Sequence, residues 1–174
     1  MRTLFFTLIL LVAITPSFGQ GLTETFDQSC QCWEVKNHYD DGQLSAIYYE
    51  NEARQKDGVM KQYSSEGKLL KEEFWKDGKL DGVATSYHPD GSVYLKATYK
   101  MGKKMGKWVF QDPDGTPSQE ITYIGKGADG VYAHYHAGVR YAEQIIENGK
   151  LVDTKIINQE IYEVVQEENA NKKK

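Results

Sequence analysis

Two histidines flank a tyrosine in the segment His134-Tyr135-His136, at a spacing that could bind a metal ion. Side chains two positions apart on a β-strand point to the same face, so both imidazoles could coordinate one ion. A metal site also needs a third ligand, and the spacing of the sequence fixes none. We therefore expect two surface histidines on an aromatic-rich strand, and we keep a metal-dependent hydrolase centred on His134 and His136 as the alternative.

The other motifs that carry chemistry fail on their spacing. Asp112 and Asp114 could begin a calcium loop, but its twelfth position, which must supply a bidentate acid, holds Tyr123. The sequence has no Gly-x-Ser-x-Gly elbow and no Gly-Lys-Ser/Thr phosphate loop. We expect a protein that is not an enzyme, with no catalytic residue, metal site or cofactor.

The two cysteines, Cys30 and Cys32, are separated by one residue. A disulfide between such neighbours requires a bent backbone, because the bond normally joins Cα atoms about 5.5 Å apart. The pair could form a local disulfide, an intermolecular link or a reactive dithiol. Reactive pairs usually have two residues between the cysteines, so we favour a structural or incidental pair.

Aromatic side chains are the remaining candidates for recognition, because they offer a large contact area with little loss of entropy. The alternative is that each of them only packs one hairpin on the next. The residues that we propose as a binding face are Trp75, Tyr87, Tyr99, Trp108, Tyr123 and Tyr135.

Glycines recur with a period of 24 residues and indicate how these side chains are positioned. One series is Gly58, Gly82, Gly106 and Gly130; a second is Gly67, Gly91 and Gly115; a third is Gly78, Gly102, Gly125 and Gly149, at intervals of 24, 23 and 24. Between the glycines, apolar and polar residues alternate as in strands, and Pro, Asp and Gly form turns. We attribute the glycines to these turns. The period predicts tandem β-hairpins, each stabilised by its neighbours.

The expected fold is all-β, an open twisted antiparallel sheet of about five hairpin repeats over residues 38–151. Large side chains at Trp75, Tyr99, Tyr123 and Ile146, eight positions after glycines 67, 91, 115 and 138, should stack along the sheet. We expect an irregular N-terminal cap segment at 20–37 and a disordered tail at 169–174. Residues 152–168 follow a helical apolar pattern, which predicts a short C-terminal capping helix; a continued strand is the alternative.

The first nineteen residues predict a cleaved secretory signal peptide. Arg2 precedes an apolar run of 11 residues, and Gly19 is a small residue at the expected cleavage site. A membrane-spanning helix needs about 20 residues, so we expect no transmembrane segment after cleavage and an exported chain, periplasmic or extracellular. The mature chain would carry 20 basic against 25 acidic residues, a net charge of -5. This acidity argues against nucleic acid as a partner.

The stretch from Tyr99 to Trp108, with glycines at 102 and 106, resembles the MORN-repeat pattern, specifically the variant found in the YwqK-family antitoxins. The stretches 74–82 and 123–130 match the pattern more loosely. The resemblance covers roughly residues 38–151 and implies a ladder of β-hairpins. The antitoxin label implies binding to a toxin, and other MORN proteins are scaffolds or membrane-associated modules. A binding or scaffold role toward a protein or cell-envelope component is therefore expected, with a lipid-surface module as an alternative.

Departures from the pattern lie in residues 49–56, which lack the expected glycine, and after Gly58, Gly82 and Gly130, where valine replaces the aromatic residue.

Overall fold

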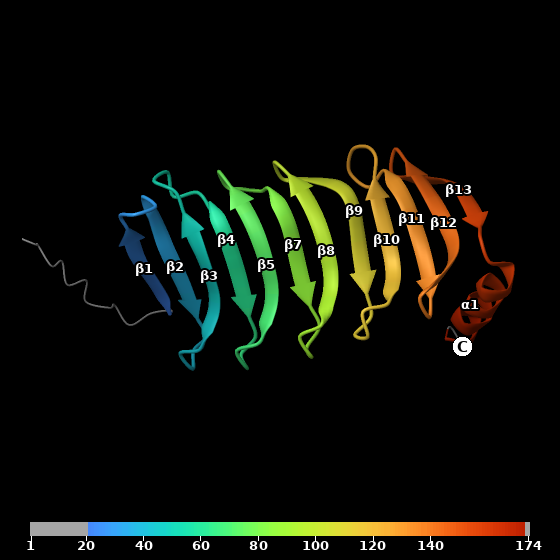
Figure 1. Cartoon of the computed structure of the whole chain (residues 1–174), viewed down its shortest axis with the longest axis horizontal. Helices are drawn as coiled ribbons and strands as arrows, with labels where there is room; N and C mark the ends of the chain where they lie inside the picture. Colours follow the sequence, from blue (N-terminus) through green and yellow to red (C-terminus); the bar gives the residue numbers. More distant parts are fainter. Residues whose placement is uncertain (1–20, 173–174) are drawn as a thin grey trace, which may run out of the picture.

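The computed structural model describes residues 21–172, so the predicted signal peptide at 1–19 lies outside the described residues. The described chain forms one antiparallel sheet whose strands follow the order of the sequence, and a helix ends it (Figure 1). This is the predicted all-β repeat fold. The elements are β1 (Leu22–Asp27), β2 (Cys32–His38), β3 (Leu44–Glu50), β4 (Gly58–Tyr63), β5 (Leu69–Lys76), β6 (Lys79–Leu80), β7 (Gly82–Tyr87), β8 (Val93–Lys100), β9 (Lys103–Gln111), β10 (Pro117–Tyr123), β11 (Gly130–His136), β12 (Val139–Glu147), β13 (Lys150–Ile156) and α1 (Gln159–Asn171). The two-residue strand β6 pairs only with β5.

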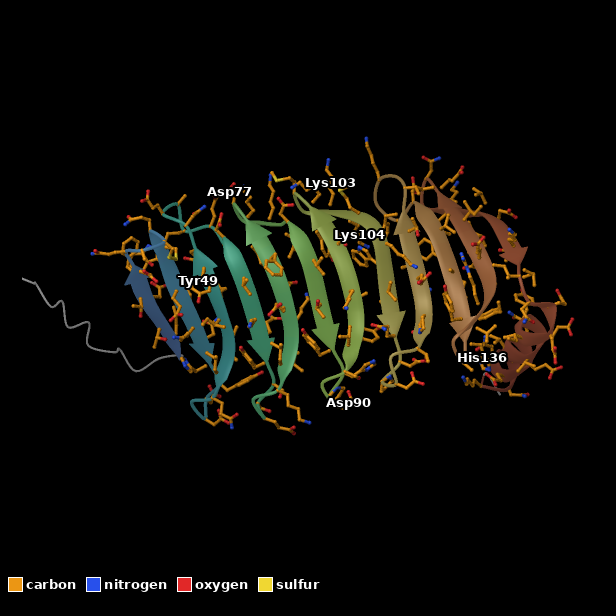
Figure 2. The ribbon with its side chains drawn as sticks, viewed as in Figure 1. Tyr49, Asp77, Asp90, Lys103, Lys104 and His136 are labelled. Carbon is orange, nitrogen blue, oxygen red and sulfur yellow. A yellow bond between two sulfur atoms is a disulfide. The ribbon has the colours of Figure 1, made fainter. Side chains whose placement is uncertain are left out.

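The turn between β7 and β8, at one edge of the sheet, is built around an aspartate. Between β7 and β8, the amide of His88 donates to the carbonyl of Ser92 at 2.8 Å, and the amide of Gly91 donates to the carbonyl of His88 at 2.9 Å. One carboxylate oxygen of Asp90 accepts from the Ser92 amide at 2.9 Å and from its hydroxyl at 2.6 Å. These bonds lower the pKa of Asp90 from its ordinary value, the hydroxyl bond contributing most. Figure 2 places Asp90 at this edge.

The opposite edge of the sheet includes two-residue turns. Met101 and Gly102, between β8 and β9, both have positive φ, at 49° and 78°. Two such residues in a hairpin form the two-residue turn that matches the twist of the flanking strands. Asp77 and Lys103 lie at this edge in Figure 2, opposite the edge that carries Asp90. Each 24-residue repeat therefore contributes one turn to each edge.

The two faces of the sheet differ in burial. Residues directly paired across antiparallel strands lie on the same face, as do residues two apart in one strand. The register places Trp75, Tyr99, Trp108 and Tyr123 on one face, which we call the aromatic face. The buried cluster of Ala84, Ala97, Trp108 and Ile121 lies on this face as well. Most of the buried side chains thus lie on this one face, where side chains of neighbouring strands pack together, and the buried Ala133 lies on the other.

Not all of the periodic glycines lie in turns, contrary to the prediction from sequence. Gly82 and Gly130 begin strands β7 and β11, and each pairs with a large residue, Tyr99 and Tyr123 respectively. Gly82 has a φ of 141°, and a Cβ there would lie 2.9 Å from the Cβ of Phe74. A Cβ on Gly130 would lie 2.5 Å from the carbonyl oxygen of Thr122. These glycines are required because neighbouring strands leave no room for a side chain.

The two ends of the sheet differ from the expected segments. Residues 22–38 form the regular hairpin β1–β2 rather than an irregular segment. Residues 150–156 form strand β13, and the predicted helix begins only at Gln159 and ends at Asn171. Asn158 caps it by accepting the amide of Ile161 at 3.1 Å. Within residues 21–172, no helix is long and apolar enough to cross a membrane.

Candidate functional site

A continuous row of aromatic rings crosses strands β8 to β11 on the aromatic face. The ring centroids are 5.1 Å apart for Tyr99 and Trp108, 5.0 Å for Trp108 and Tyr123, and 6.4 Å for Tyr123 and Tyr132. Trp108 is 6% exposed, whereas the three tyrosines are half-buried. The indole nitrogen of Trp108 donates to the carbonyl of Thr98 at 3.0 Å. Trp108 therefore anchors the row, and the tyrosines present its accessible surface.

Burial affects the hydroxyl groups of this row. It raises the pKa of Tyr99, Tyr123 and Tyr132 from the ordinary tyrosine value, because removal from water disfavours the charged phenolate. The rings thus stay neutral throughout the physiological range and act as hydrogen-bonding, partly apolar surfaces.

Two lysines lie over aromatic rings of the sheet. The Nζ of Lys104 is 5.2 Å from the ring centroid of Trp108 and 5.1 Å from that of Tyr123, and it donates to the Tyr123 hydroxyl at 3.4 Å. Further along the sheet, the Nζ of Lys56 is 4.9 Å from the Tyr48 ring and 4.8 Å from the Trp75 ring. Both lysines satisfy the distance at which an ammonium is attracted to a π face. The aromatic face therefore combines rings with positive charge.

A hydrogen bond from its indole nitrogen fixes the orientation of the Trp75 ring. Its indole nitrogen donates to a carboxylate oxygen of the buried Glu73 at 3.2 Å, and Lys71 forms an ion pair with the other oxygen at 2.5 Å. The indole is half-buried. The ring is thus fixed in orientation and partly accessible.

The six residues proposed from sequence do not share one surface. Trp75, Tyr99, Trp108 and Tyr123 lie on the aromatic face. Tyr87 ends β7 after a register shift and pairs with Val93, and Tyr135 follows a second shift. The four residues expected to stack do share the aromatic face, since Ile146 pairs with Gly130; the direct neighbour between Tyr99 and Tyr123 is Trp108.

Tyr135 belongs to a polar cluster on the opposite face. Its hydroxyl donates to Glu120 at 2.8 Å, and Lys107 forms an ion pair with the same carboxylate at 2.5 Å. Burial acts to raise the pKa of Glu120, but the bonds from Lys107 and Tyr135 outweigh it and hold that pKa below its ordinary value. Burial, followed by the bond to Glu120, raises the pKa of Tyr135. The polar groups of this cluster therefore bind one another.

The two histidines considered for a metal have other contacts. The Nε2 of His134 is 3.0 Å from the Gln144 side-chain oxygen, and its Nδ1 is 3.5 Å from the Gln119 side-chain nitrogen. A register shift follows His134. His136 pairs with Val139 at the end of β11, at the same edge of the sheet as Asp90 (Figure 2). Across residues 21–172, no group of three His, Cys, Asp or Glu side chains is close enough to hold a metal. His134 is thus positioned by two glutamines.

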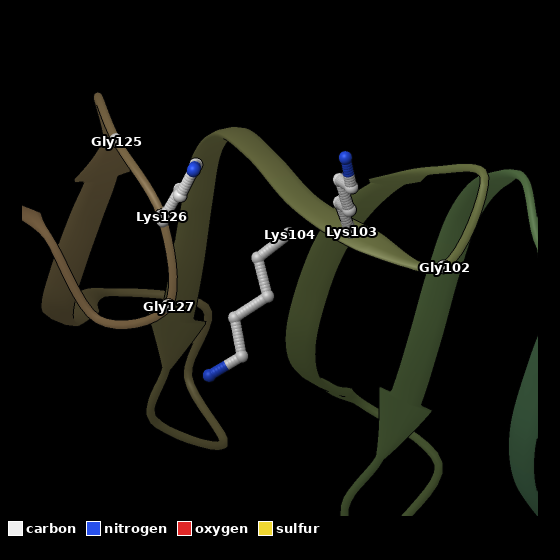
Figure 3. A pocket seen from close by; sticks show the side chains of 6 residues that line it. All are labelled: Gly102, Lys103, Lys104, Gly125, Lys126 and Gly127. Atoms are coloured by element: carbon white, nitrogen blue, oxygen red, sulfur yellow. The ribbon is translucent and has the colours of Figure 1, made fainter.

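The sequence-based prediction missed one cavity, of about 470 Å³, at the edge that carries the tight turns. Its lining residues come from the β8–β9 turn and the β10–β11 loop: Gly102, Lys103, Lys104, Gly125, Lys126 and Gly127 (Figure 3). A signal for it was present, because every glycine of the third series precedes a lysine, at Lys79, Lys103, Lys126 and Lys150. The same period that predicts the turns thus also predicts a row of lysines along one edge.

The cysteines form an intrachain disulfide, with Cα atoms 5.2 Å apart, which links Cys30 of the β1–β2 turn to Cys32, the first residue of β2.

No curated protein matches this sequence. Two segments, residues 56–77 and 80–101, match the family model described as MORN repeat variant. The first covers β4 and β5, and the second covers β7 and β8, so each match corresponds to one 24-residue hairpin unit of the sheet.

Proposed function

We propose that this protein is an exported, non-enzymatic binding or scaffold module, which engages a protein or another cell-envelope component through its aromatic face. The observation that carries the proposal is the row Tyr99–Trp108–Tyr123–Tyr132, in which a buried tryptophan packs against two half-buried tyrosines and the second of these packs against a third. Rigid tyrosines and tryptophans lose little entropy on binding and concentrate the energy of protein interfaces. The MORN-type repeats supply the extended sheet on which such a row can be built.

Two observations support the proposal that the protein is exported. The first is the basic and apolar N-terminal pattern of residues 1–19, which is typical of a signal peptide. The second is the disulfide between Cys30 and Cys32, since disulfides persist mainly in oxidising compartments such as the periplasm or the extracellular space. An antitoxin-like role would be one form of this function, with a toxin as the protein bound.

Neighbouring residues on β5 provide a matched test. Trp75 lies on the aromatic face and Phe74, next to it, must point to the opposite face, where it is 42% exposed. We would immobilise the wild-type protein, Trp75→Ser and Phe74→Ser, check each by circular dichroism, and capture partners from solubilised envelope fractions of the source cells. The proposal expects a reproducible partner with the wild type and Phe74→Ser, and its loss with Trp75→Ser.

Equal capture by both variants would overturn the aromatic face as the binding surface. Failure to recover any reproducible envelope component would overturn the binding role. Export has its own test: the processed chain should be found outside the cytoplasm, with Gln20 as its first residue.

A further inference from the structure

We infer that the cavity between the β8–β9 turn and the β10–β11 loop is an anion-binding site that takes a phosphate monoester group. This inference goes beyond the proposed partner binding and does not depend on it. The cavity lies where two loops meet because β8, β9, β10 and β11 are consecutive neighbours in the sheet. Its volume of about 470 Å³ exceeds that of a phosphate group and leaves room for the organic part of an ester.

Three lysines give the cavity its charge. The side chain of Lys104 extends into the space between the two loops, while Lys103 and Lys126 rise from its two rims (Figure 3). The three ammonium groups point in different directions in Figure 3, but each adds positive potential at the cavity that it borders, which favours an anion there. A cluster of this kind raises the local concentration of anions even on a protein whose formal net charge is -4.

Within the described residues, these three lysines have no acidic partner, unlike six other lysines of the sheet. Lys36, Lys61, Lys68, Lys71, Lys100 and Lys107 each lie within 4.0 Å of a carboxylate. Over the part of the chain that the structure describes, no such ion pair is formed by Lys103, Lys104 or Lys126. The ammonium of Lys104 is oriented by the rings of Trp108 and Tyr123, which leave its charge uncompensated. The ammonium group of Lys104 is thus fixed in position and can interact with an anion.

The backbone of the β10–β11 loop adds uncharged donors. Between residues 124 and 129, the backbone hydrogen bonds run from the Ile124 amide to Asp129 and from the Asp129 amide to Lys126. Within residues 21–172, the amides of Gly125 and Gly127, two residues that line the cavity, donate no hydrogen bond to another protein atom. Gly127 has a φ of 68°, and a Cβ there would meet nothing within 4 Å, so the loop is accessible as well as bent. Exposed amides beside ammonium groups are the usual elements of phosphate sites.

The test is a titration with inorganic phosphate and with glycerol 3-phosphate, followed by amide chemical shifts of 15N-labelled protein. It should be run at low ionic strength, because screening weakens a partly exposed site. We expect both ligands to shift the amides of residues 102–104 and 125–127 together. In Lys104→Gln/Lys126→Gln the affinity should fall roughly tenfold for each ammonium group removed. Lys104→Arg/Lys126→Arg should retain binding, which separates loss of charge from loss of structure.

Lys96→Gln/Lys155→Gln is the matched control, since it removes the same charge from two exposed lysines away from the cavity. The inference is overturned if phosphate leaves both loops unshifted, if the Lys104→Gln/Lys126→Gln variant binds as the wild type does, or if the control loses as much affinity. Vesicles containing phosphatidic acid, against vesicles of phosphatidylcholine alone, distinguish the source of the group. If the protein binds the phosphatidic acid vesicles and glycerol 3-phosphate displaces it from them, the site takes the phosphate of a lipid headgroup. If no such competition is found, the site takes the phosphate of a soluble ester.

Discussion

Substitution of Trp108 by alanine should lower the free energy of unfolding by about 4 kcal/mol. Trp108 is 6% exposed, and its ring contacts those of Tyr99 and Tyr123. A tryptophan buries about 150–250 Å². At about 25 cal/mol per Å², this corresponds to roughly 4–6 kcal/mol, an upper value because the unfolded chain already buries part of its surface. Truncations of this kind cost about 3–5 kcal/mol in other cores.

A loss of about 4 kcal/mol in the free energy of unfolding is large for a fold built on a single sheet. Small domains are stable by about 5–15 kcal/mol in total, so the variant should lose much of its cooperative structure. Trp108→Phe should cost less, because it keeps the ring packing and removes mainly the hydrogen bond to the Thr98 carbonyl. Phe74→Ala is the control: its side chain is 42% exposed and makes no part of the buried cluster.

Urea unfolding followed by far-ultraviolet circular dichroism measures these free energies. Hydrogen exchange should show where the loss falls, since amides of β8, β9 and β10 should open first in Trp108→Ala. If Trp108→Ala costs less than about 1.5 kcal/mol, or no more than Phe74→Ala, then the aromatic row is not the centre of the core and the reasoning is wrong.

Three further changes test the local structure. Gly82→Ala should destabilise the sheet by about 1–3 kcal/mol, because it introduces strain at a positive φ and a clash with the Cβ of Phe74. Part of this loss should be recovered in Gly82→Ala/Phe74→Gly, which removes that Cβ, and additive losses in urea would contradict the clash. The pKa of Asp90 is lower in the folded than in the unfolded protein, so its hydrogen bonds stabilise the fold above the unfolded pKa, and this stabilisation is lost as the pH falls through the folded pKa. In Ser92→Ala, an NMR titration should show the pKa of Asp90 closer to its ordinary value. An unchanged pKa in this variant would refute the role assigned to Ser92. Replacing both cysteines by serine should cost about 1.5 kcal/mol by the loop-entropy rule, since the closed loop is very short, and a much larger loss on thermal unfolding would show that β1 and β2 anchor the whole sheet.

The sequence predicts the strand pattern well because the same local signal is repeated. Turn residues at fixed spacing, such as His88-Pro89-Asp90-Gly91, determine where each hairpin reverses, and the sheet follows because each hairpin must pack on the next. Each strand pairs with the next one along the chain, except that β5 also pairs with β7 past the short β6, so no long-range pairing had to be inferred. Local information was therefore sufficient for the fold.

Predictions that depend on side chains from different strands were less complete. The need for glycine at Gly82 comes from Phe74 on the adjacent strand, and turn chemistry alone does not reveal it. Register shifts after Ser86 and His134 change how Tyr87 and Tyr135 are placed, because an extra residue in one strand alters the alternation that follows.

The lysine-lined cavity was missed for a related reason. Lys103 and Lys126 are separated by most of a repeat, and only the packing of consecutive hairpins brings their loops together. The helix boundary differs because residues 150–156 continue the pairing with β12, which outweighs their helical spacing.

The order of the strands also determines how the protein responds to force. The first and last strands, β1 and β13, lie at opposite ends of the sheet, and each strand is hydrogen-bonded only to those beside it (Figure 1). Tension between the two ends of the chain would therefore act across the ladders and break them one strand pair at a time. A sheet loaded in this way yields at low force and lengthens in steps of one hairpin, so an anchored copy could extend under strain without losing all of its repeats at once.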